Sequence, residues 1–240
     1  MRVMRRVGLG LVLFMTAFAG ASACQSAANL PKPTVTAKGT AGDEDIPDLT
    51  IRQVTLKAGE TLLVSCNDEG GDAEVSWGDA SLHKDASAHG SGFYTMIFTV
   101  YSANGGTADI VASHLSGGDL IINAYSITNL APSALDKTAV ATGTGTSPAS
   151  GSTAATSHAN ELLWGSIGYA SNAKATGTWS EGFTSGAQFT NTGGISGVDD
   201  GYKTVSSTGA YAATKSGVDK DAWAALIATY ATAAGSNPVR

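Results

Sequence analysis

Short apolar runs separated by turn-forming residues recur along most of the chain. The runs are rich in β-branched and aromatic residues, and glycine, asparagine and aspartate gather between them. This spacing is typical of the strands of an antiparallel sandwich or barrel. It predicts strands over residues 51–56, 61–66, 73–77, 94–101, 107–113, 120–127, 137–143, 161–169, 176–179, 186–190, 201–206, 210–214 and 222–232.

Residues 94–101 show the alternation of a strand most clearly. Tyr94, Met96, Phe98 and Val100 fall on one face, and the alternate positions, which include two threonines, fall on the other. Successive side chains of a strand point to opposite faces of its sheet. We therefore expect the first face to lie on the core.

One segment, residues 221–232, fits two periodicities. Large apolar side chains recur at helical spacing from Trp223 to Tyr230, after Asp221 as an N-cap, but alternate positions are also apolar, as in a strand. The matching part of the first half of the chain, residues 120–125, is a strand-like apolar run. We therefore predict a strand, with a helix as the alternative.

The chain repeats itself loosely at an offset of about 100 residues. ETLL at 60–63 matches NELL at 160–163, a Trp-bearing and then a Tyr-bearing strand follow each, and each half ends in a long apolar strand. Two interleaved β units are what a jelly roll of paired Greek keys shows, and two tandem domains are the alternative. Because each half would hold few aromatic residues, we favour one sandwich over residues 49–234.

The order of these segments also carries a family resemblance. SWG at 76–78, AYS at 124–126, a Thr/Gly/Ser stretch with Pro148, and ELLWG at 161–165 follow one another. This order resembles jelly-roll modules of concanavalin-like topology found in secreted bacterial and phage-associated proteins. The resemblance covers residues 49–234 and implies the fold, an all-β antiparallel sandwich (jelly roll). It implies no activity, because it is a pattern of strands without a catalytic signature.

The N-terminus has the pattern of an export signal. Three arginines precede an apolar run over residues 7–19, and small residues then lead to Cys24. The apolar run is shorter than the about 20 residues of a comfortable transmembrane helix. We therefore interpret residues 1–23 as a signal peptide helix that is removed after export.

Two cleavages compete at this point. ASA at 21–23 is a site for the ordinary signal peptidase. Together with Cys24 it also resembles a bacterial lipobox, in which the cysteine becomes the lipidated first residue, although Ala21 stands where the lipobox usually has leucine. We favour a lipid anchor on Cys24, with a secreted or periplasmic protein as the alternative. Gln25 resembles the residue after the cysteine in Gram-negative lipoproteins and implies the outer membrane or cell surface.

The residues after Cys24 favour the lipoprotein. Residues 24–48 are rich in Ala, Pro, Thr, Gly and acidic residues, so we predict a flexible, disordered tether. Residues 235–240 are expected to form a C-terminal tail. Cys66, the only other cysteine, lies in an apolar run and is expected to be a buried core residue, with a disulfide to Cys24 as the alternative.

Charge excludes some partners. Removing the signal peptide, which holds three of the 14 basic residues and none of the 20 acidic ones, leaves a net charge of −9. An acidic chain without a Lys/Arg cluster is a poor partner for nucleic acid and for anionic lipid surfaces. Only 14% of the residues are charged, and Thr, Ser, Gly and Ala take their place, as in extracellular β structure.

Catalytic and cofactor motifs are absent from the sequence. It contains no HExxH, CxxC, GxSxG or phosphate-binding loop, and we expect no cofactor. The four histidines all stand in polar, turn-like contexts, and a catalytic or metal site would need several of them to converge. We expect solvated loop histidines at His83, His89, His114 and His158.

Carboxylates are the stronger chemical hint. Asp68, Glu69 and Asp72 share a glycine-containing loop that offers hard oxygen ligands for a structural calcium ion, with solvated surface acids as the alternative. A glycosidase needs two facing carboxylates. Glu161 and Glu181 are available, but nothing in the sequence pairs them.

The aromatic residues carry the sharpest binding hypothesis. Sugar-binding modules stack aromatic rings on pyranose faces. Trp77 and Trp164 stand among apolar residues and are expected in the core. An exposed aromatic platform is predicted in the glycine-rich second half, formed by Trp179, Phe183, Tyr202 and Tyr211.

These features together favour a non-enzymatic, surface-exposed lipoprotein. Its β-sandwich would serve attachment or surface structure, with a polysaccharide or surface glycan as the ligand. A jelly-roll carbohydrate-active hydrolase is one alternative, and a passive component of an extracellular assembly is another. The sequence leaves the oligomeric state open.

The lipid anchor gives a first prediction. Cys24→Ser is expected to abolish acyl labelling and membrane fractionation, because only a thiol accepts the lipid at this position. Detergent partitioning measures the effect, and Cys66→Ala is the control that keeps the anchor. Unchanged partitioning of Cys24→Ser would exclude lipidation.

Overall fold

The computed structural model describes residues 31–114, 117–170, 177–190 and 197–233. It contains sixteen strands and no helix in this part of the chain, and every pairing between strands is antiparallel. The predicted all-β sandwich is therefore confirmed. No helix that is long and apolar enough to cross a membrane is found among the described residues. Cys24, the predicted signal peptide and the predicted C-terminal tail lie outside them.

The N-terminal unit, residues 34–128, consists of two sheets. Its inner sheet has the order β1 (Thr34–Asp43), β9 (Leu120–Thr128), β3 (Glu60–Asp68), β7 (Tyr94–Ser102) and β6 (His83–His89). Its outer sheet has the order β2 (Asp48–Leu56), β8 (Gly106–Ser113), β4 (Glu74–Trp77) and β5 (Ala80–Ser81).

The C-terminal unit, residues 130–232, has an inner sheet of the same kind. Its order is β10 (Leu130–Gly145), β16 (Asp221–Thr232), β11 (Asn160–Tyr169), β14 (Gly197–Ser206) and β13 (Thr184–Thr190). Its outer layer has only two short strands, β12 (Thr178–Trp179) and β15 (Lys215–Ser216). Backbone hydrogen bonds extend this layer, since residues 148–156 bond to 209–215 and Ser180 bonds to Thr214.

Strand order shows that the two units have the same topology. In each inner sheet the first strand of the unit lies at one edge and pairs with the last, which pairs with a strand from early in the unit. The outer layers also correspond, because β8 lies between β2 and β4 as the β15 segment lies between residues 148–156 and β12. Each unit is thus a jelly roll.

The predicted single, interleaved sandwich is wrong in this respect. No strand pairing in the described part of the chain joins one unit to the other. The predicted internal match is nevertheless real, since β3 corresponds to β11, β4 to β12, β7 to β14 and β9 to β16. The structure instead has the alternative arrangement of two tandem units. Few aromatic residues are needed per unit because the two units share a core.

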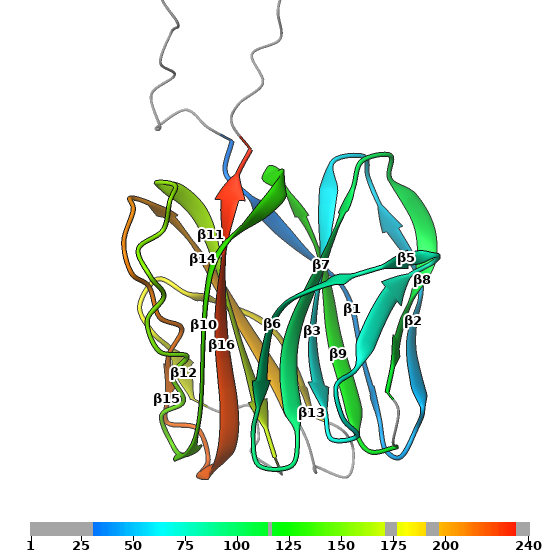
Figure 1. Cartoon of the computed structure of the whole chain (residues 1–240), viewed down its shortest axis with the longest axis vertical. Coiled ribbons are helices and arrows are strands. Elements are labelled where there is room, and N and C mark those ends of the chain that lie inside the picture. Colours follow the sequence, from blue (N-terminus) through cyan, green and yellow to red (C-terminus); the bar gives the residue numbers. More distant parts are fainter. Residues whose placement is uncertain (1–30, 115–116, 171–176, 191–196, 234–240) are drawn as a thin grey trace, which may run out of the picture.

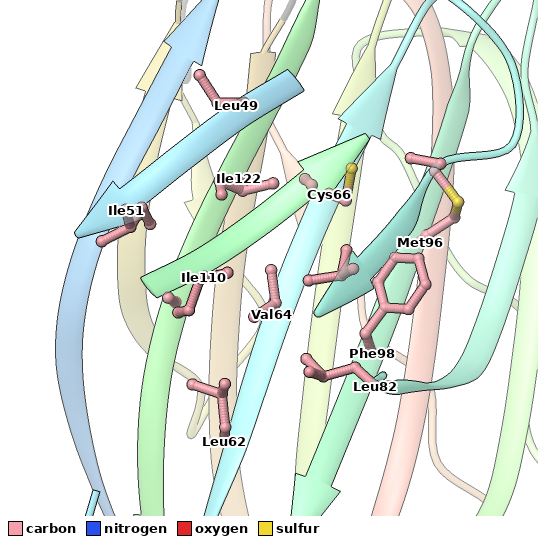
Figure 2. Packing of buried hydrophobic residues seen from close by; sticks show 14 of the residues in the cluster. Leu49, Ile51, Leu62, Val64, Cys66, Leu82, Met96, Phe98, Ile110 and Ile122 are labelled. Atoms are coloured by element: carbon pink, nitrogen blue, oxygen red, sulfur yellow. The ribbon is translucent and has the colours of Figure 1, made fainter. Parts of the chain in front are cut away.

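The two jelly rolls pack with their inner sheets face to face, which gives four layers (Figure 1). Between the two sheets of the N-terminal unit lies an apolar core of side chains from β2, β3, β7, β8 and β9 (Figure 2). A second core, which includes Leu63 and Trp164, lies between the inner sheets. A third, which includes Ile167 and Trp179, lies under the outer layer of the C-terminal unit.

Both inner sheets are covered on both faces, which explains their burial. Every residue of β3 is buried, and β11 is buried from Glu161 to Tyr169. For 94–101 the expectation was half right. Met96 and Phe98 face the first core as predicted, but Ile97 is equally buried because it faces the second. A strand with two covered faces loses the polar alternation of a half-exposed strand.

The tether expectation is wrong for residues 34–43. This segment is β1, which pairs with β9 along its whole length, with a bulge at Lys38 between Ala37 and Gly39. Its residues are small or polar and mostly half-buried or exposed, so they give no apolar signal. The strand forms because the apolar β9 offers a free edge of backbone donors and acceptors.

Smaller differences concern short segments. Residues 221–232 form a strand, as predicted. The predicted strand at 210–214 is irregular chain with one isolated bridge at Thr214. Strand β6, which was not predicted, has the polar sequence of an edge strand.

Polar side chains connect the two units through the middle of the second core. Asp200 Oδ2 accepts hydrogen bonds from Asn123 Nδ2 at 2.9 Å and from the Tyr125 hydroxyl at 2.8 Å. The Trp164 indole donates to Ser65 Oγ at 3.2 Å. All five residues are buried. A polar contact of this kind fixes the register of one sheet on the other, because a slipped arrangement would leave buried groups without partners.

The two inner sheets approach each other closely near Gly168. Asn67 of the N-terminal unit donates to the backbone carbonyl of Tyr169 at 3.2 Å. A Cβ atom at Gly168, the neighbouring position, would lie 2.0 Å from Thr95 Oγ1 and 2.2 Å from Asn67 Oδ1. The sheets can approach to this distance only because residue 168 has no side chain.

The buried Asp200 predicts a pH dependence of stability. Burial raises the pKa of Asp200 to about 6, although hydrogen bonds from Ser65, Asn123 and Tyr125 oppose the shift. The unfolded value is about 3.9, so the contribution is fully present below about pH 4 and is lost as pH rises through about 6. We expect the free energy of unfolding to fall by roughly 2–3 kcal/mol across this window.

Urea unfolding at a series of pH values tests this. Asp200→Asn, which can still accept from Tyr125, is expected to lose that part of the pH dependence. Asp79→Asn, at an exposed turn, is the control and should follow the wild type. An equal pH dependence in Asp200→Asn and wild type would contradict the assignment.

Candidate functional site

A groove of about 390 Å³ opens where the two units meet along β6, β7 and the start of β10. Its volume lies in the range of small-ligand sites, which often occur at interfaces between units. Its lining combines hydroxyl, imidazole, carboxylate and apolar groups. The lining residues are Ser81, His83, Asp85, Thr99, Val100, Tyr101, Pro132, Ser133, Ala134 and Leu135.

Asp85 is placed in the groove by a β-bulge. The register between β6 and β7 shifts between Lys84 and Ala86, so Asp85 is the extra residue. Bulges often turn a side chain toward a functional site. Here the carboxylate turns inward, and its side chain is only 1% exposed although β6 is an edge strand.

Three side chains satisfy this carboxylate. Oδ2 accepts from Thr99 Oγ1 at 2.8 Å and from the Tyr230 hydroxyl at 2.7 Å, and Oδ1 lies 2.7 Å from His83 Nδ1. Tyr230 comes from β16, so the site includes both units. Burial and the Asp85 carboxylate raise the pKa of Tyr230, which keeps its hydroxyl a donor.

The contact with Asp85 also orients His83. A neutral imidazole next to a carboxylate carries its proton on the facing nitrogen, so we assign the proton to Nδ1. The other nitrogen, Nε2, is then an acceptor. Because the His83 side chain is 75% exposed, this acceptor is available to a ligand in the groove.

The remaining walls of the groove are mixed in character. Ser81 and Ser133 are exposed, and Tyr101 is half-buried. Leu135 is 37% exposed, one of only two large hydrophobic side chains with that much exposure in the described chain. The groove therefore offers hydroxyl groups and one imidazole acceptor beside an apolar wall.

The structure brings Trp179, Phe183 and Tyr211 together at the third core and places Tyr202 apart from them, at the second core. Trp179 is 6% exposed and packs in the third core, where its ring stacks on Phe183 with centroids 5.7 Å apart. Tyr202 is on β14, on the face of the inner sheet that forms the second core, and stacks on Trp164 with ring centroids 5.7 Å apart. Tyr211 is half-buried and donates to the Ser207 carbonyl at 2.5 Å. Four rings on one exposed surface are not found.

The carboxylates of the predicted calcium site are also apart. Asp68 is buried against His114, with Oδ1 and Nδ1 2.6 Å apart, whereas Asp72 forms an exposed ion pair with Lys84 at 2.6 Å. Burial, and then repulsion by Asp119 and Asp68, raises the pKa of Glu69 to about 7. In the described chain no group of three or more His, Cys, Asp or Glu side chains is arranged to hold a metal ion.

His114 corrects the expectation of solvated histidines. It is 8% exposed, and its two ring nitrogens face the Asp68 carboxylate and the Ile46 carbonyl. The Ile46 carbonyl can only accept, so Nε2 carries a proton, and a second proton on Nδ1 makes the ring an imidazolium. Burial opposes this charge, but Asp68 and the Ile46 carbonyl outweigh it and raise the pKa of His114. His89 and His158 are exposed, as predicted.

The two candidate glycosidase carboxylates do not face each other. Glu161 is fully buried at the start of β11, and burial followed by nearby Asp136 raises its pKa. Glu181 is exposed in the turn before β13. Cys66 is buried with a free thiol, as expected.

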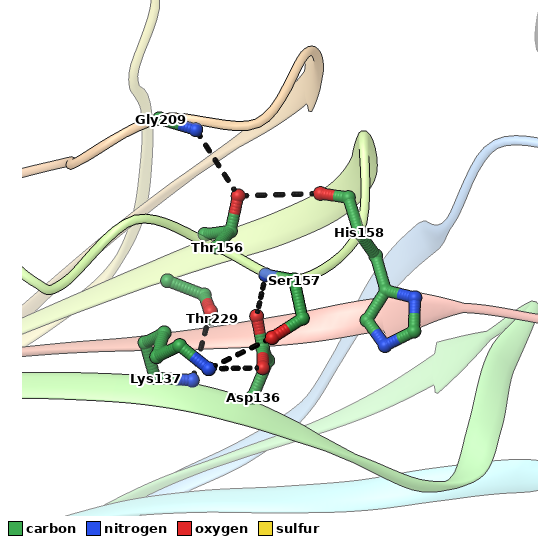
Figure 3. A network of polar contacts seen from close by, with 7 residues as sticks. All are labelled: Asp136, Lys137, Thr156, Ser157, His158, Gly209 and Thr229. Atoms are coloured by element: carbon green, nitrogen blue, oxygen red, sulfur yellow. Dashed lines mark hydrogen bonds and ion pairs between the residues drawn. The ribbon is translucent and has the colours of Figure 1, made fainter.

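Asp136 belongs to a polar network at the bend of β10 (Figure 3). Its carboxylate accepts from Lys137 Nζ at 2.7 Å and from the Ser157 backbone at 2.5 Å. Desolvation opposes ionisation, but these donors hold the pKa of Asp136 well below its usual range. Thr156 Oγ1 continues the network by donating to the His158 carbonyl and accepting from the Gly209 backbone. The network fixes the outer layer to the inner sheet.

Sequence reasoning missed the groove. Its key groups, Asp85, Thr99 and Tyr230, are far apart in the chain and belong to no motif. The only signal was His83 and Asp85 at alternate positions, which on a regular strand would share a face. Neither a protein-family model nor a curated protein matches this chain.

The hydrogen bonds of Asp85 predict unequal effects of mutation. Asp85→Ala leaves the buried Tyr230 hydroxyl without an acceptor, so we expect a loss of about 2–3 kcal/mol in the free energy of unfolding. His83→Ala should cost less than about 0.5 kcal/mol, because His83 is exposed. Urea unfolding measures both. If the free energy of unfolding falls by the same amount in both variants, the contact of Asp85 with Tyr230 does not hold the two units together.

Proposed function

We propose that this protein is a non-enzymatic, surface-exposed lipoprotein whose tandem jelly rolls bind a neutral glycan in the groove between the units. The observation that carries the proposal is the groove itself, where an oriented imidazole and several hydroxyl groups stand beside exposed apolar side chains. Attachment or surface structure is the role that such binding serves.

The chemistry of the groove fits a sugar. A pyranose has hydroxyl groups that donate and accept at its rim and C–H groups on its faces. His83 Nε2 accepts a hydrogen bond, Ser81 and Ser133 can do both, and Tyr101 and Leu135 provide apolar surface. The net charge of −9 after signal removal disfavours acidic polysaccharides, which leaves neutral glycans.

The lipid anchor on Cys24 would hold the protein at the outer membrane or cell surface. Since β1 begins at Thr34, the tether is shorter than the sequence indicated. About ten residues then separate the lipid from the fold, and their extended reach is at most roughly 35 Å. The proposal therefore places the tandem jelly rolls close to the membrane.

Hydrolysis is the second candidate, and the contact of His83 with Asp85 favours it. A carboxylate on Nδ1 prepares a histidine to take a proton at Nε2. Such a base would activate water or a serine hydroxyl in the groove. When the protein is incubated with a polysaccharide, binding without release of products supports a glycan-binding module. Release of shorter sugars supports a hydrolase.

A glycan array followed by titration of the strongest ligand tests the proposal. His83→Ala and Tyr101→Ala are expected to weaken binding at least tenfold, while Tyr211→Ala, outside the groove, leaves it unchanged. EDTA is included because Asp68, Glu69 and Asp72 were the candidate calcium ligands. Loss of binding in Tyr211→Ala alone would move the site to the predicted aromatic residues.

The passive structural alternative has its own outcome. If no neutral glycan binds and size-exclusion chromatography or electron microscopy shows ordered assemblies, the protein is a component of an extracellular structure. That result would overturn the proposal.

A further inference from the structure

An ion pair lies fully inside the C-terminal unit, between its two layers. Asp199 is on β14 of the inner sheet, and Lys215 is on β15 of the outer layer. Lys215 Nζ is in direct contact with Asp199 Oδ2, and both side chains are 0% exposed. Lysine and aspartate are almost never fully buried unless they are paired, so each of these residues depends on the other for its burial.

The surroundings of the pair are aromatic and dry. The Trp179 ring centroid lies 6.0 Å from Lys215 Nζ, and Tyr169 belongs to the same apolar core. The Asp199 carboxyl also faces the Trp179 indole and Gln188. Trp179 itself has room because residues 165 and 201 are glycines, where an added Cβ would lie 3.1 Å and 2.7 Å from the indole.

As a simple ion pair this arrangement stabilises little. The cost of removing two charges from water often exceeds their attraction, and an apolar pair of the same volume would serve as well. An amine and a carboxylic acid held in contact without water can instead condense. Proximity of this kind gives intramolecular reactions very high effective concentrations.

We propose that Lys215 and Asp199 form an intramolecular isopeptide bond. The proposal rests on the direct Nζ–Oδ2 contact, on the complete burial of both side chains and on their position between the two layers.

The reaction is balanced within the pair. Proton transfer from Lys215 to Asp199 first gives the neutral amine and the neutral acid. The lone pair of Nζ then attacks Cγ and forms the C–N bond. The C–O bond to the acid hydroxyl breaks, and this hydroxyl leaves as water with one proton from Nζ. No oxidant, reductant or further reactant is required.

Neighbouring groups favour this step. Burial raises the pKa of Asp199, which favours the neutral acid that the reaction consumes. Trp179 Nε1 and Asp199 Oδ1 are both buried without a hydrogen-bond partner among the described residues, so this indole N–H is available to the oxygen that becomes negative during the reaction. The overall reaction also replaces the buried ammonium and carboxylate groups by one neutral amide.

The location of the bond explains its value. The outer layer of the N-terminal unit has four paired strands, whereas that of the C-terminal unit has two strands of two residues each. A covalent link from β14 to β15 would hold this thin layer on its sheet. It would close a loop of the chain that includes β14 and the segment before β15, and so destabilise the unfolded state.

Mass spectrometry of the wild-type protein tests the proposal without any mutation. The purified chain is denatured, reduced and digested with trypsin. We expect a branched peptide that joins the sequences around residues 199 and 215, lighter by one water than the sum of its parts, and no cleavage after Lys215. Separate linear peptides in full yield would overturn the proposal, and so would a loss of water mapped to other residues.

Variants give an independent measurement. Lys215→Arg keeps the charge but cannot form the amide, so its intact mass should exceed that of the wild type by the residue difference plus one water. Asp199→Asn can still react, with ammonia as the leaving group, and should give a product of the same mass as the wild type. If Lys215→Arg differs only by the residue mass, the bond does not form.

Discussion

The face-to-face packing of the two inner sheets is the constraint on which the rest of the structure depends. Each jelly roll presents one sheet to the other, and side chains from both form the second core. A polar contact, from Asn123 and Tyr125 to Asp200, lies in its centre and removes the freedom of the sheets to slide. Because this contact is buried, any other register would leave polar groups unsatisfied, at a cost of about 1–3 kcal/mol each. The glycine at position 168 allows the close approach.

The groove and the buried ion pair are both consequences of this arrangement. The groove exists only where β6 of one unit meets β10 of the other, and Asp85 accepts from Tyr230 across that boundary. The C-terminal unit contributes its inner sheet to the shared core, while its outer layer is thin. That layer is held by the network around Asp136 and by the contact of Lys215 with Asp199. Binding is thus proposed for the groove between the units, and covalent stabilisation for the interior of the C-terminal unit.

Most strands could be predicted because their apolar runs and turn residues are local properties. The internal match was also readable, since Trp77 and Trp179 do lie on corresponding strands. Pairing was not readable, because an apolar strand does not indicate which strand covers its second face. The sequence therefore could not distinguish one interleaved sandwich from two tandem units, and the small number of aromatic residues in each half favoured the wrong one. Strand β1 was missed for the same reason, since it is held by the edge of β9 and not by apolar residues of its own.

The sequence by itself determined the all-β class, the positions of most strands, the repeat and the buried environment of Cys66 and Trp164. These depend on hydrophobicity and turn chemistry, which act over a few residues. Only the tertiary structure decided that the repeats are separate jelly rolls and that Trp179 is buried. It also decided that His83 and Asp85 line a groove and that Tyr230 donates to Asp85 there. Such sites join residues up to 145 positions apart. Their chemistry depends on burial and contact, and neither property is local in the chain.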